Sequence, residues 1–207
     1  MKRIKPNSYY VSARTHNGIT YYEFEHYEYI WDDGFSFDNY SISPNKIYFE
    51  NASWSGRIAV EREAQIPIPA ELYNDWHNLI TETRERIVLL GKNNCRPMQG
   101  KPNIGDYLFY HYTKDEEDEY DYDFSYFYKI VDIGDDFYKV EDIIDVYMYN
   151  FGCNHTIRIK REDYEIERIL KSQLVDESII NDVSQITQEL IAKLTKEIAE
   201  VIKGKTQ

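Results

Sequence analysis

The chain has 207 residues, of which 37 are Asp or Glu and 24 are Lys or Arg, and its formal net charge is −13. This length allows one or two domains with a proper hydrophobic core, and 20 Tyr, 9 Phe and 3 Trp supply large side chains for it. The charge argues against direct binding to DNA or RNA, because non-specific affinity comes from Lys and Arg that displace counterions from phosphates. We therefore expect a folded protein with basic partners or none.

Cysteine usage and the N-terminal residues bear on the compartment. Cys95 and Cys153 are the only cysteines, and Met1-Lys-Arg-Ile-Lys-Pro6 runs into polar residues without an apolar leader segment. No apolar run approaches the roughly 20 residues that span a bilayer, and an acidic surface is repelled by anionic lipids. The sequence predicts a cytoplasmic protein that binds no membrane.

Residues 8–51 show the pattern of an antiparallel meander of four strands. Turn residues interrupt the strand pattern at Asn17-Gly18, Asp33-Gly34 and Ser43-Pro44-Asn45. Asn-Gly is a strong hairpin signal, because both residues tolerate the positive φ of a type I′ turn.

Strict alternation divides the second of these strands, residues 19–31, into two faces. One face carries Tyr22, Phe24, His26, Glu28 and Ile30, and the other carries Tyr21, Glu23, Glu25, Tyr27 and Tyr29. We expect the first face to be the core, although Glu28 fits it poorly.

A fifth strand is predicted over residues 57–67, ending where Pro67 and Pro69 remove backbone donors. A helix over residues 70–90 follows, because apolar side chains recur there mostly at three- and four-residue spacing. Gly91 is predicted to stop this helix in a left-handed conformation. Trp76 lies in the middle of the apolar stripe and is expected to anchor the core.

Residues 93–103 have the composition of a linker or a long loop. Short strands are predicted after it, over residues 107–112, 124–133, 137–140, 143–151 and 155–160, and their close spacing favours a small barrel. The segment Ile104-Gly105-Asp106-Tyr107 resembles the SH3-like small barrels, in which a Gly-Asp turn leads the first strand. The resemblance covers about sixty residues of this chain and implies a fold rather than a function.

A long amphipathic helix is predicted over residues 177–202. Its aliphatic stripe consists of Ile179, Val183, Ile186, Leu190, Leu194, Ile198 and Val201. So long a helix tends to outrun a small domain, and we expect residues 190–202 to serve as the seam of a homo-oligomer.

Motifs of catalysis are missing from the sequence. It contains no phosphate-binding loop, no zinc-protease helix motif, no nucleophile elbow and no dinucleotide fingerprint. Cys153 and His155 form only an i, i+2 pair at a turn, and the paired spacing of structural zinc ligands around Cys95 is absent. The sequence therefore predicts no catalytic residue, no metal and no cofactor.

Two pairs of glutamates have a spacing like that of the acid and base carboxylates in hydrolases. Glu23 and Glu25, or Glu61 and Glu63, would project about 7 Å apart on one face of a strand, within the range of paired acid and base carboxylates. Such pairs are common on exposed strand faces. A solvated face is therefore the favoured interpretation, and a hydrolase is the third alternative for function.

The most unusual segment is an acidic turn at residues 114–123, which holds seven acids and one base. A fold tolerates such repulsion on a solvated loop or opposite a basic partner, and tyrosines add rigid contact area. A solvated loop without a partner remains the alternative. The expected partner-binding residues are Asp115, Glu116, Glu117, Asp118, Glu119, Tyr120, Asp121, Tyr122 and Asp123.

The sequence thus predicts an α+β protein. Its expected parts are an antiparallel sheet with one helix over residues 1–92, a linker over 93–103, a small barrel over 104–170 and a helix with a tail over 171–207. The expected function is non-catalytic binding of a basic protein. The specific form of this hypothesis is a nucleic-acid mimic, acting as an inhibitor or as an immunity or anti-defence factor. A structural subunit, for example of a phage particle, is the first alternative.

Overall fold

The computed structural model describes residues 2–31, 34–55, 59–112, 124–135, 137–145, 156–160 and 169–205. The chain divides into two compact units: unit 1 comprises Met1–Thr81 with Glu189–Gln207, and unit 2 comprises Glu82–Gln188. Each unit contains an antiparallel five-stranded sheet and parts of two long helices, which confirms the α+β class. The domain limits expected from the sequence stay predictions.

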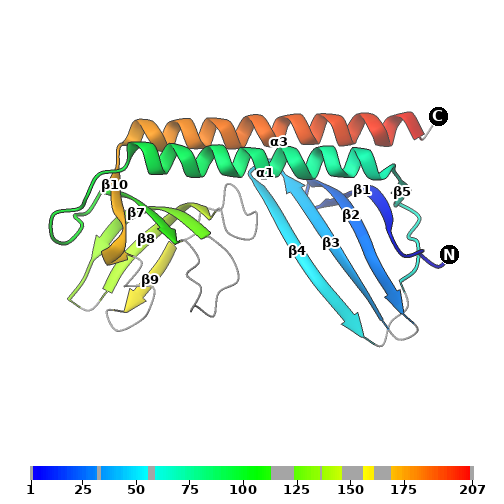
Figure 1. Ribbon diagram of the computed structural model, residues 1–207, viewed down its shortest axis with the longest axis horizontal. Coiled ribbons are helices and arrows are strands. Elements are labelled where there is room, and N and C mark those ends of the chain that lie inside the picture. The colour runs from blue at the N-terminus through cyan, green and yellow to red at the C-terminus, as the bar shows by residue number, and fades with distance from the viewer. Residues whose placement is uncertain are drawn as a thin grey trace. The chain divides into compact units, whose positions relative to one another are not determined.

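The sheet of unit 1 has the strand order β4-β3-β2-β1-β5 (Figure 1). Asn17 and Gly18 have φ angles of 50° and 76°, as the hairpin prediction requires. The predicted meander of four strands is thereby confirmed. The strands are β1 (Ser8–His16), β2 (Ile19–Trp31), β3 (Gly34–Ser43), β4 (Lys46–Ser55) and β5 (Ile66–Pro67).

The fifth strand is much shorter than the predicted 57–67, since β5 has only 2 residues. Within the described part of the preceding segment, Val60 forms an isolated bridge with Arg3, and the amide of Gln65 donates to the carbonyl of Arg62 in a turn. These contacts fold residues 59–65 into a loop instead of extending the strand.

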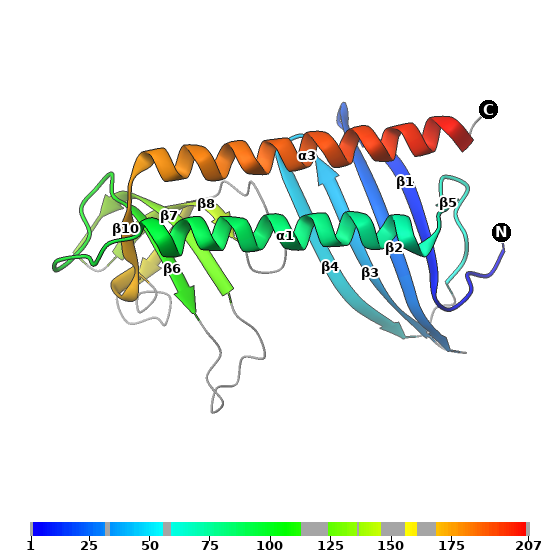
Figure 2. The same cartoon turned by 45° about the horizontal axis from the view of Figure 1, so that its top comes forward.

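Two long helices cover one face of each sheet (Figures 1 and 2). Helix α1 (Ala70–Asn94) contributes its residues up to Thr81 to unit 1, and helix α3 (Glu177–Lys205) contributes its residues from Glu189 to unit 1. The predicted C-terminal helix is confirmed. No helix among the described residues is long and apolar enough to cross a membrane.

Gly91 does not stop α1, contrary to the prediction, because the helix continues to Asn94. A Cβ atom at this position would lie 2.5 Å from a carbon of the Phe109 ring in unit 2. The glycine therefore permits close packing of the helix on the sheet rather than a left-handed turn.

The α1-facing side of the unit 1 sheet is an aromatic core. The Phe24 ring contacts the rings of Tyr40, Tyr73 and Trp76 at centroid distances of 4.5, 5.3 and 5.4 Å. Trp76 is fully buried, as predicted, and its Nε1 donates to Glu197 Oε2 of α3 at 2.9 Å. The predicted core face of β2 is thus confirmed at Phe24. Ile30 lies on the other side, because a bulge between Tyr27 and Tyr29 shifts the register.

The aliphatic stripe of α3 is buried within this chain. Of the predicted stripe, Ile179 and Val201 are half-buried, and Ile180 and Ile191, which the stripe did not include, are buried as well. The buried members of the stripe are Val183, Ile186, Leu190, Leu194 and Ile198. Packing within this chain therefore supplies the apolar contacts that we expected a second copy of the chain to provide in a homo-oligomer. Homo-oligomerisation therefore stays a prediction that this stripe no longer supports.

The sheet of unit 2 has the strand order β10-β6-β7-β8-β9. The sequence predicted a break within 141–142, whereas β8 is continuous from Phe137 to Asp145. The described strands form an open order with β10 and β9 at its ends, and the closed SH3-like barrel is not confirmed. The strands are β6 (Tyr107–Tyr112), β7 (Phe124–Ile133), β8 (Phe137–Asp145), β9 (Thr156–Lys160) and β10 (Gln173–Val175).

The two sheets share one topology. In each, four consecutive strands form a meander, a short fifth strand pairs antiparallel with the first, and a long helix follows. The short strands place Pro67 and Leu174 three residues before Ala70 and Glu177, the first residues of the two helices. Cross-strand pairing then gives two matching rows, Pro67–Tyr10–Glu25–Asn39–Glu50 and Leu174–Leu108–Tyr128–Asp142.

Candidate functional site

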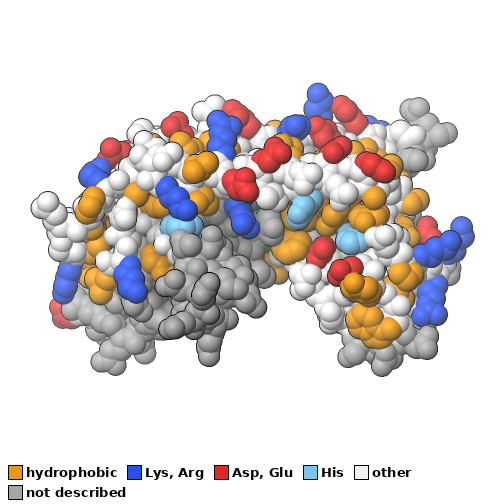
Figure 3. Space-filling model, viewed as in Figure 1, with side chains coloured by type: hydrophobic (Ala, Val, Ile, Leu, Met, Phe, Trp, Pro, Cys, Tyr) orange, Lys and Arg blue, Asp and Glu red, His pale blue; other side chains and the backbone are white. Residues whose placement is uncertain are grey.

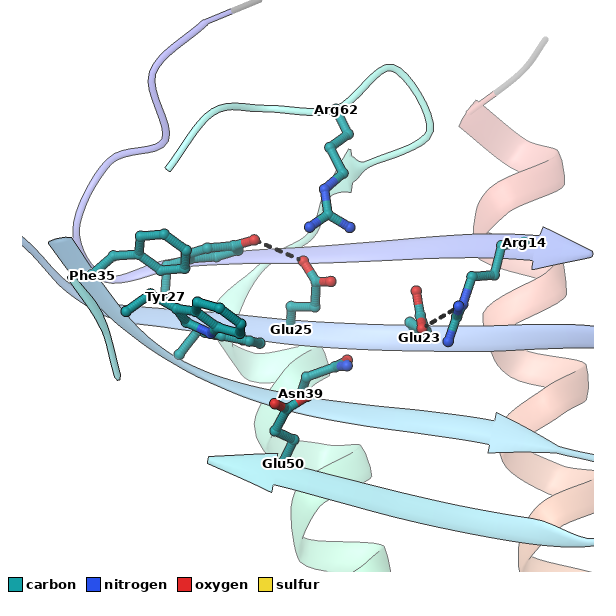
Figure 4. A pocket seen from close by; sticks show the side chains of 10 residues that line it. Arg14, Glu23, Glu25, Tyr27, Phe35, Asn39, Glu50 and Arg62 are labelled. Carbon is teal, nitrogen blue, oxygen red and sulfur yellow. Dashed lines mark hydrogen bonds and ion pairs between the residues drawn. The ribbon is translucent and has the colours of Figure 1, made fainter. Parts of the chain in front are cut away.

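A pocket of about 350 Å³ opens on the outer face of the unit 1 sheet, which we define as the face opposite Phe24 and Tyr40. Figure 4 shows side chains from β1, β2, β3 and the loop before β5 converging on it. The pocket is lined by Arg14, Glu23, Glu25, Tyr27, Phe35, Phe37, Asn39, Glu50, Trp54 and Arg62.

Glu23 and Glu25 are both buried, with exposed fractions of 7% and 4%. The sequence favoured a solvated face for this pair, and that interpretation is wrong. The alternation of β2 was read correctly, but the loop before β5 folds over this face and brings Arg62 and Gln65 to it. Both faces of the strand are therefore covered, which a pattern of alternating polar residues does not indicate.

Glu25 is held by a hydrogen-bond network within unit 1. Its Oε2 accepts from Gln65 Nε2 at 2.5 Å and from the Tyr27 hydroxyl at 3.2 Å, and Gln65 Oε1 accepts from the Arg62 amide at 2.8 Å. Burial raises the pKa of Glu25 above its ordinary value, against the opposing effects of the Gln65 hydrogen bond and the Arg62 charge. Burial and the neighbouring Glu25 also raise the pKa of Tyr27 to about 12.

Glu23 is held by different partners. Arg14 Nε lies 2.9 Å from Glu23 Oε1, and the Ser12 hydroxyl donates to Glu23 Oε2 at 3.4 Å. The two neighbouring carboxylates therefore have separate partners. Arg14 supplies a positive charge to Glu23, whereas the hydrogen bonds of Glu25 come from neutral groups.

A hydrolase needs two carboxylates that are free to exchange protons with a substrate and with water. In this pocket both oxygens of Glu23 are engaged by Arg14 and Ser12, and one oxygen of Glu25 accepts two hydrogen bonds. These contacts favour a supporting role for the pair over proton transfer.

Glu50 and Asn39 are the two acceptors in the pocket that lack such partners. Neither the Glu50 carboxylate nor the Asn39 side chain has a hydrogen bond or an ion pair within the described part of the chain, and Asn39 Oδ1 is a fully buried atom. The two residues are directly paired across β3 and β4, so their side chains share the outer face. Figure 4 shows them next to each other at the rim formed by these strands.

Aromatic rings form one wall of the pocket. Tyr27 and Phe37 are stacked with a centroid distance of 5.8 Å, and Phe35 lies 5.7 Å from Phe37. Trp54 is 45% exposed at the open side. In the space-filling view, hydrophobic side chains gather near the end of β4 with acidic side chains beside them (Figure 3).

The other residues that the sequence singled out do not join this pocket. The acidic turn from Asp115 to Asp123, and Cys153 with His155, lie outside the described residues. Glu61 and Glu63 lie in the loop before β5 and not on a strand. The described ranges contain no group of three His, Cys, Asp or Glu placed to hold a metal ion.

Cys95 belongs to unit 2 and does not line the pocket. Its thiol donates to Gln173 Oε1, and burial raises the thiol pKa. A raised pKa lowers the thiolate fraction, which does not favour a nucleophile.

Sequence reasoning missed Asn39, Glu50 and the aromatic wall. Alternation along residues 34–55 was a usable signal, because it places Phe35, Phe37 and Asn39 on one face of β3 and Glu50 and Trp54 on one face of β4. Only the register between strands, which the sequence does not provide, brings these faces together with Glu25.

No protein-family model, curated protein or solved structure matches this chain.

Proposed function

We propose that this chain is a non-catalytic binding protein for a basic protein partner, and that the unit 1 pocket receives a cationic side chain of that partner. The observation that carries the proposal is the pair Glu50 and Asn39, two residues that line the pocket and whose side chains have no partner among the described residues. An unpaired buried acceptor costs free energy, and a donor from a partner recovers it.

Charge complementarity supports a basic partner. The chain carries a net charge of −13, and such a surface accelerates the encounter with a positively charged protein in a salt-dependent manner. Aromatic rings beside a carboxylate also favour cations over anions, because a ring face carries partial negative charge.

The more specific form of the proposal is that the partner is a nucleic-acid-binding protein and that residues 115–123 imitate a phosphate backbone. The seven acids of residues 114–123 are the basis for it. This form predicts that a short DNA duplex competes with the chain for the groove of a basic nucleic-acid-binding protein.

The test is a titration of the protein with a capped peptide of alternating Arg, Lys and Gly, followed by calorimetry at low and high salt. Glu50→Gln keeps the shape of the side chain and removes its charge. We expect this variant to weaken binding about tenfold, in line with the loss of one charge-assisted hydrogen bond.

Glu28→Gln is the matched control, because Glu28 is an exposed carboxylate of the same sheet that does not line the pocket. Equal weakening by both variants would show that only the overall charge matters, and the pocket proposal would then be wrong.

A further inference from the structure

We infer that the unit 1 pocket selects a guanidinium over an ammonium group, so that the side chain it takes from a partner is arginine. This inference rests on the proposed function and names the ligand class of the same site. It is carried by the arrangement of acceptors and rings around the pocket.

The acceptors Asn39 and Glu50 match the planar arrangement of N–H donors in a guanidinium. Asn39 and Glu50 are a directly paired couple on neighbouring strands, which places their Cβ atoms about 4.5–5.5 Å apart. A guanidinium has five N–H donors in one plane and can reach both an amide oxygen and a carboxylate at once. An ammonium is a compact, strongly hydrated charge that loses more on leaving water.

The aromatic wall suits the same group. Tyr27, Phe35 and Phe37 lie within 5.8 Å of one another by ring centroids, and Trp54 pairs with Phe35 across the strands at the open side. A flat guanidinium stacks on such rings while its edge donates hydrogen bonds, whereas an ammonium cannot stack.

The same face of the same sheet already holds one guanidinium in this manner. Arg14 lies with its guanidinium carbon 5.2 Å from the centroid of the Tyr21 ring, and its Nε is 2.9 Å from Glu23 Oε1. A ring and a carboxylate two residues apart on β2 thus bind an arginine together.

A lysine near this face behaves differently. Lys46 Nζ lies 5.3 Å from the Tyr48 ring centroid but has no ion pair within the described part of the chain. Lys46 thus contacts a ring alone, whereas Arg14 engages a ring and a carboxylate together.

Arg62 limits how strongly the pocket attracts a second cation. Its guanidinium points toward Glu25 in Figure 4, and its charge lowers the pKa of Glu25 in opposition to burial. Removing this charge is expected to strengthen the binding of a cationic ligand, because a like charge at the same pocket opposes it.

The experiment compares capped tripeptides of glycine with a central Arg, Lys or citrulline, each titrated into the full chain. Binding is followed through the indole N–H signal of Trp54 in protein NMR, assigned with Trp54→Phe. We expect weak binding of the arginine peptide, with a dissociation constant of about 1 mM, and at least about tenfold weaker binding of the other two.

Two variants locate the effect. Asn39→Ala is expected to reduce the preference for Arg over Lys to less than about threefold, and Arg62→Gln is expected to tighten the arginine peptide about threefold. Glu28→Gln again serves as the control and should change neither value. The backbone NMR spectrum of each variant shows whether the sheet is intact.

The outcomes separate the two proposals. Equal affinity for the Arg and Lys peptides would overturn the inference and leave the cation-binding proposal standing. Equal affinity for the Arg and citrulline peptides would show that charge is not recognised and would overturn both. Absence of any shift at Trp54 with all three peptides would also overturn both.

Discussion

The two units use one strand topology but differ in the side chains that cover their outer faces. In unit 2 the row position that corresponds to Glu25 is Tyr128, and the face that carries Tyr128, which we call the outer face of unit 2, is mostly a buried apolar cluster. The buried members of this cluster are Leu108, Tyr126, Tyr128, Ile130, Tyr138, Val140 and Ile169. Asp142, which pairs with Tyr128, is a buried carboxylate on this face. In unit 1 the outer face has a smaller buried cluster around Tyr27 and, beside it, two buried carboxylates and a pocket.

This difference teaches that the topology itself does not require the pocket. Unit 2 shows that side chains of the same chain can cover most of such a face with apolar contacts, which stabilise a fold by about 25 cal/mol per Å² buried. Buried carboxylates oppose folding unless they are well bonded. Buried carboxylates at positions where apolar side chains would stabilise the fold are a local conflict of the kind expected at functional sites.

The largest expected effect belongs to the α1-facing side of the unit 1 sheet and is that of Trp76→Ala. Trp76 is almost fully buried and contacts the Phe24 ring. Loss of the indole leaves a cavity, and the free energy of unfolding should fall by about 3–5 kcal/mol, as measured by chemical denaturation. Trp54→Ala, on the exposed rim of the pocket, should cost less. A Trp76→Ala protein as stable as the Trp54→Ala protein would refute the aromatic core.

The outer faces should differ, and Ile130→Ala in unit 2 tests this directly. Ile130 is fully buried in the apolar cluster, and its truncation should lower the free energy of unfolding by about 2–5 kcal/mol. Asn39→Ala on the outer face of unit 1 should cost no more than about 1 kcal/mol, because Asn39 Oδ1 has no partner to lose. Similar costs for the two variants would mean that both faces are ordinary core.

Glu25→Gln is expected to change the pH dependence of the free energy of unfolding. Because burial raises the folded-state pKa of Glu25 above 4.5, the folded protein holds this proton more tightly than the unfolded chain does. Its contribution to stability is therefore fully present below pH 4.5 and is lost as pH rises through the raised pKa. Glu25→Gln should remove that loss and change stability by about 1–2 kcal/mol at most.

The measurement is urea denaturation of both proteins across this pH range. Parallel pH profiles of the wild type and of Glu25→Gln would show that the Glu25 carboxyl titrates normally in the folded protein.

Arg14→Gln should have the smallest effect. The Arg14 side chain is 61% exposed, so its ion pair with Glu23 is screened by water and should contribute less than about 1 kcal/mol to the free energy of unfolding. Thermal denaturation at low and high salt is the measurement, and the difference between the two proteins should shrink as salt rises. A difference that is large and independent of salt would place the pair in a dry environment.

Much of the fold could be predicted because local signals were sufficient for it. The Asn17-Gly18 turn, the apolar stripe of α3 and the strand 107–112 depend on turn chemistry and periodicity within a few residues. Gly91 was misread because its role is a contact with Phe109, eighteen positions along the chain. Likewise, the length of β5 was misjudged because the bridge between Val60 and Arg3 is not a local feature.

The candidate site was only half predictable. Glu23 and Glu25 were identified as a pair on one strand face, but their burial depends on the loop that carries Gln65. Asn39 and Glu50 become neighbours only through the register between β3 and β4. The common topology of the units was missed for a similar reason, since residues as different as Glu25 and Tyr128 hold corresponding positions.

The division of the chain has a consequence for the order of events during synthesis. Unit 2 is continuous from Glu82 to Gln188, whereas unit 1 also needs Glu189–Gln207. The strands of unit 1 leave the ribosome first, yet the segment containing Glu197, to which Trp76 donates, is made after all of unit 2. Since domains generally fold as units, the later unit can be completed first. Until α3 emerges, the aromatic core of unit 1 is covered by α1 alone. Apolar surface left open in this way is the kind that chaperones bind.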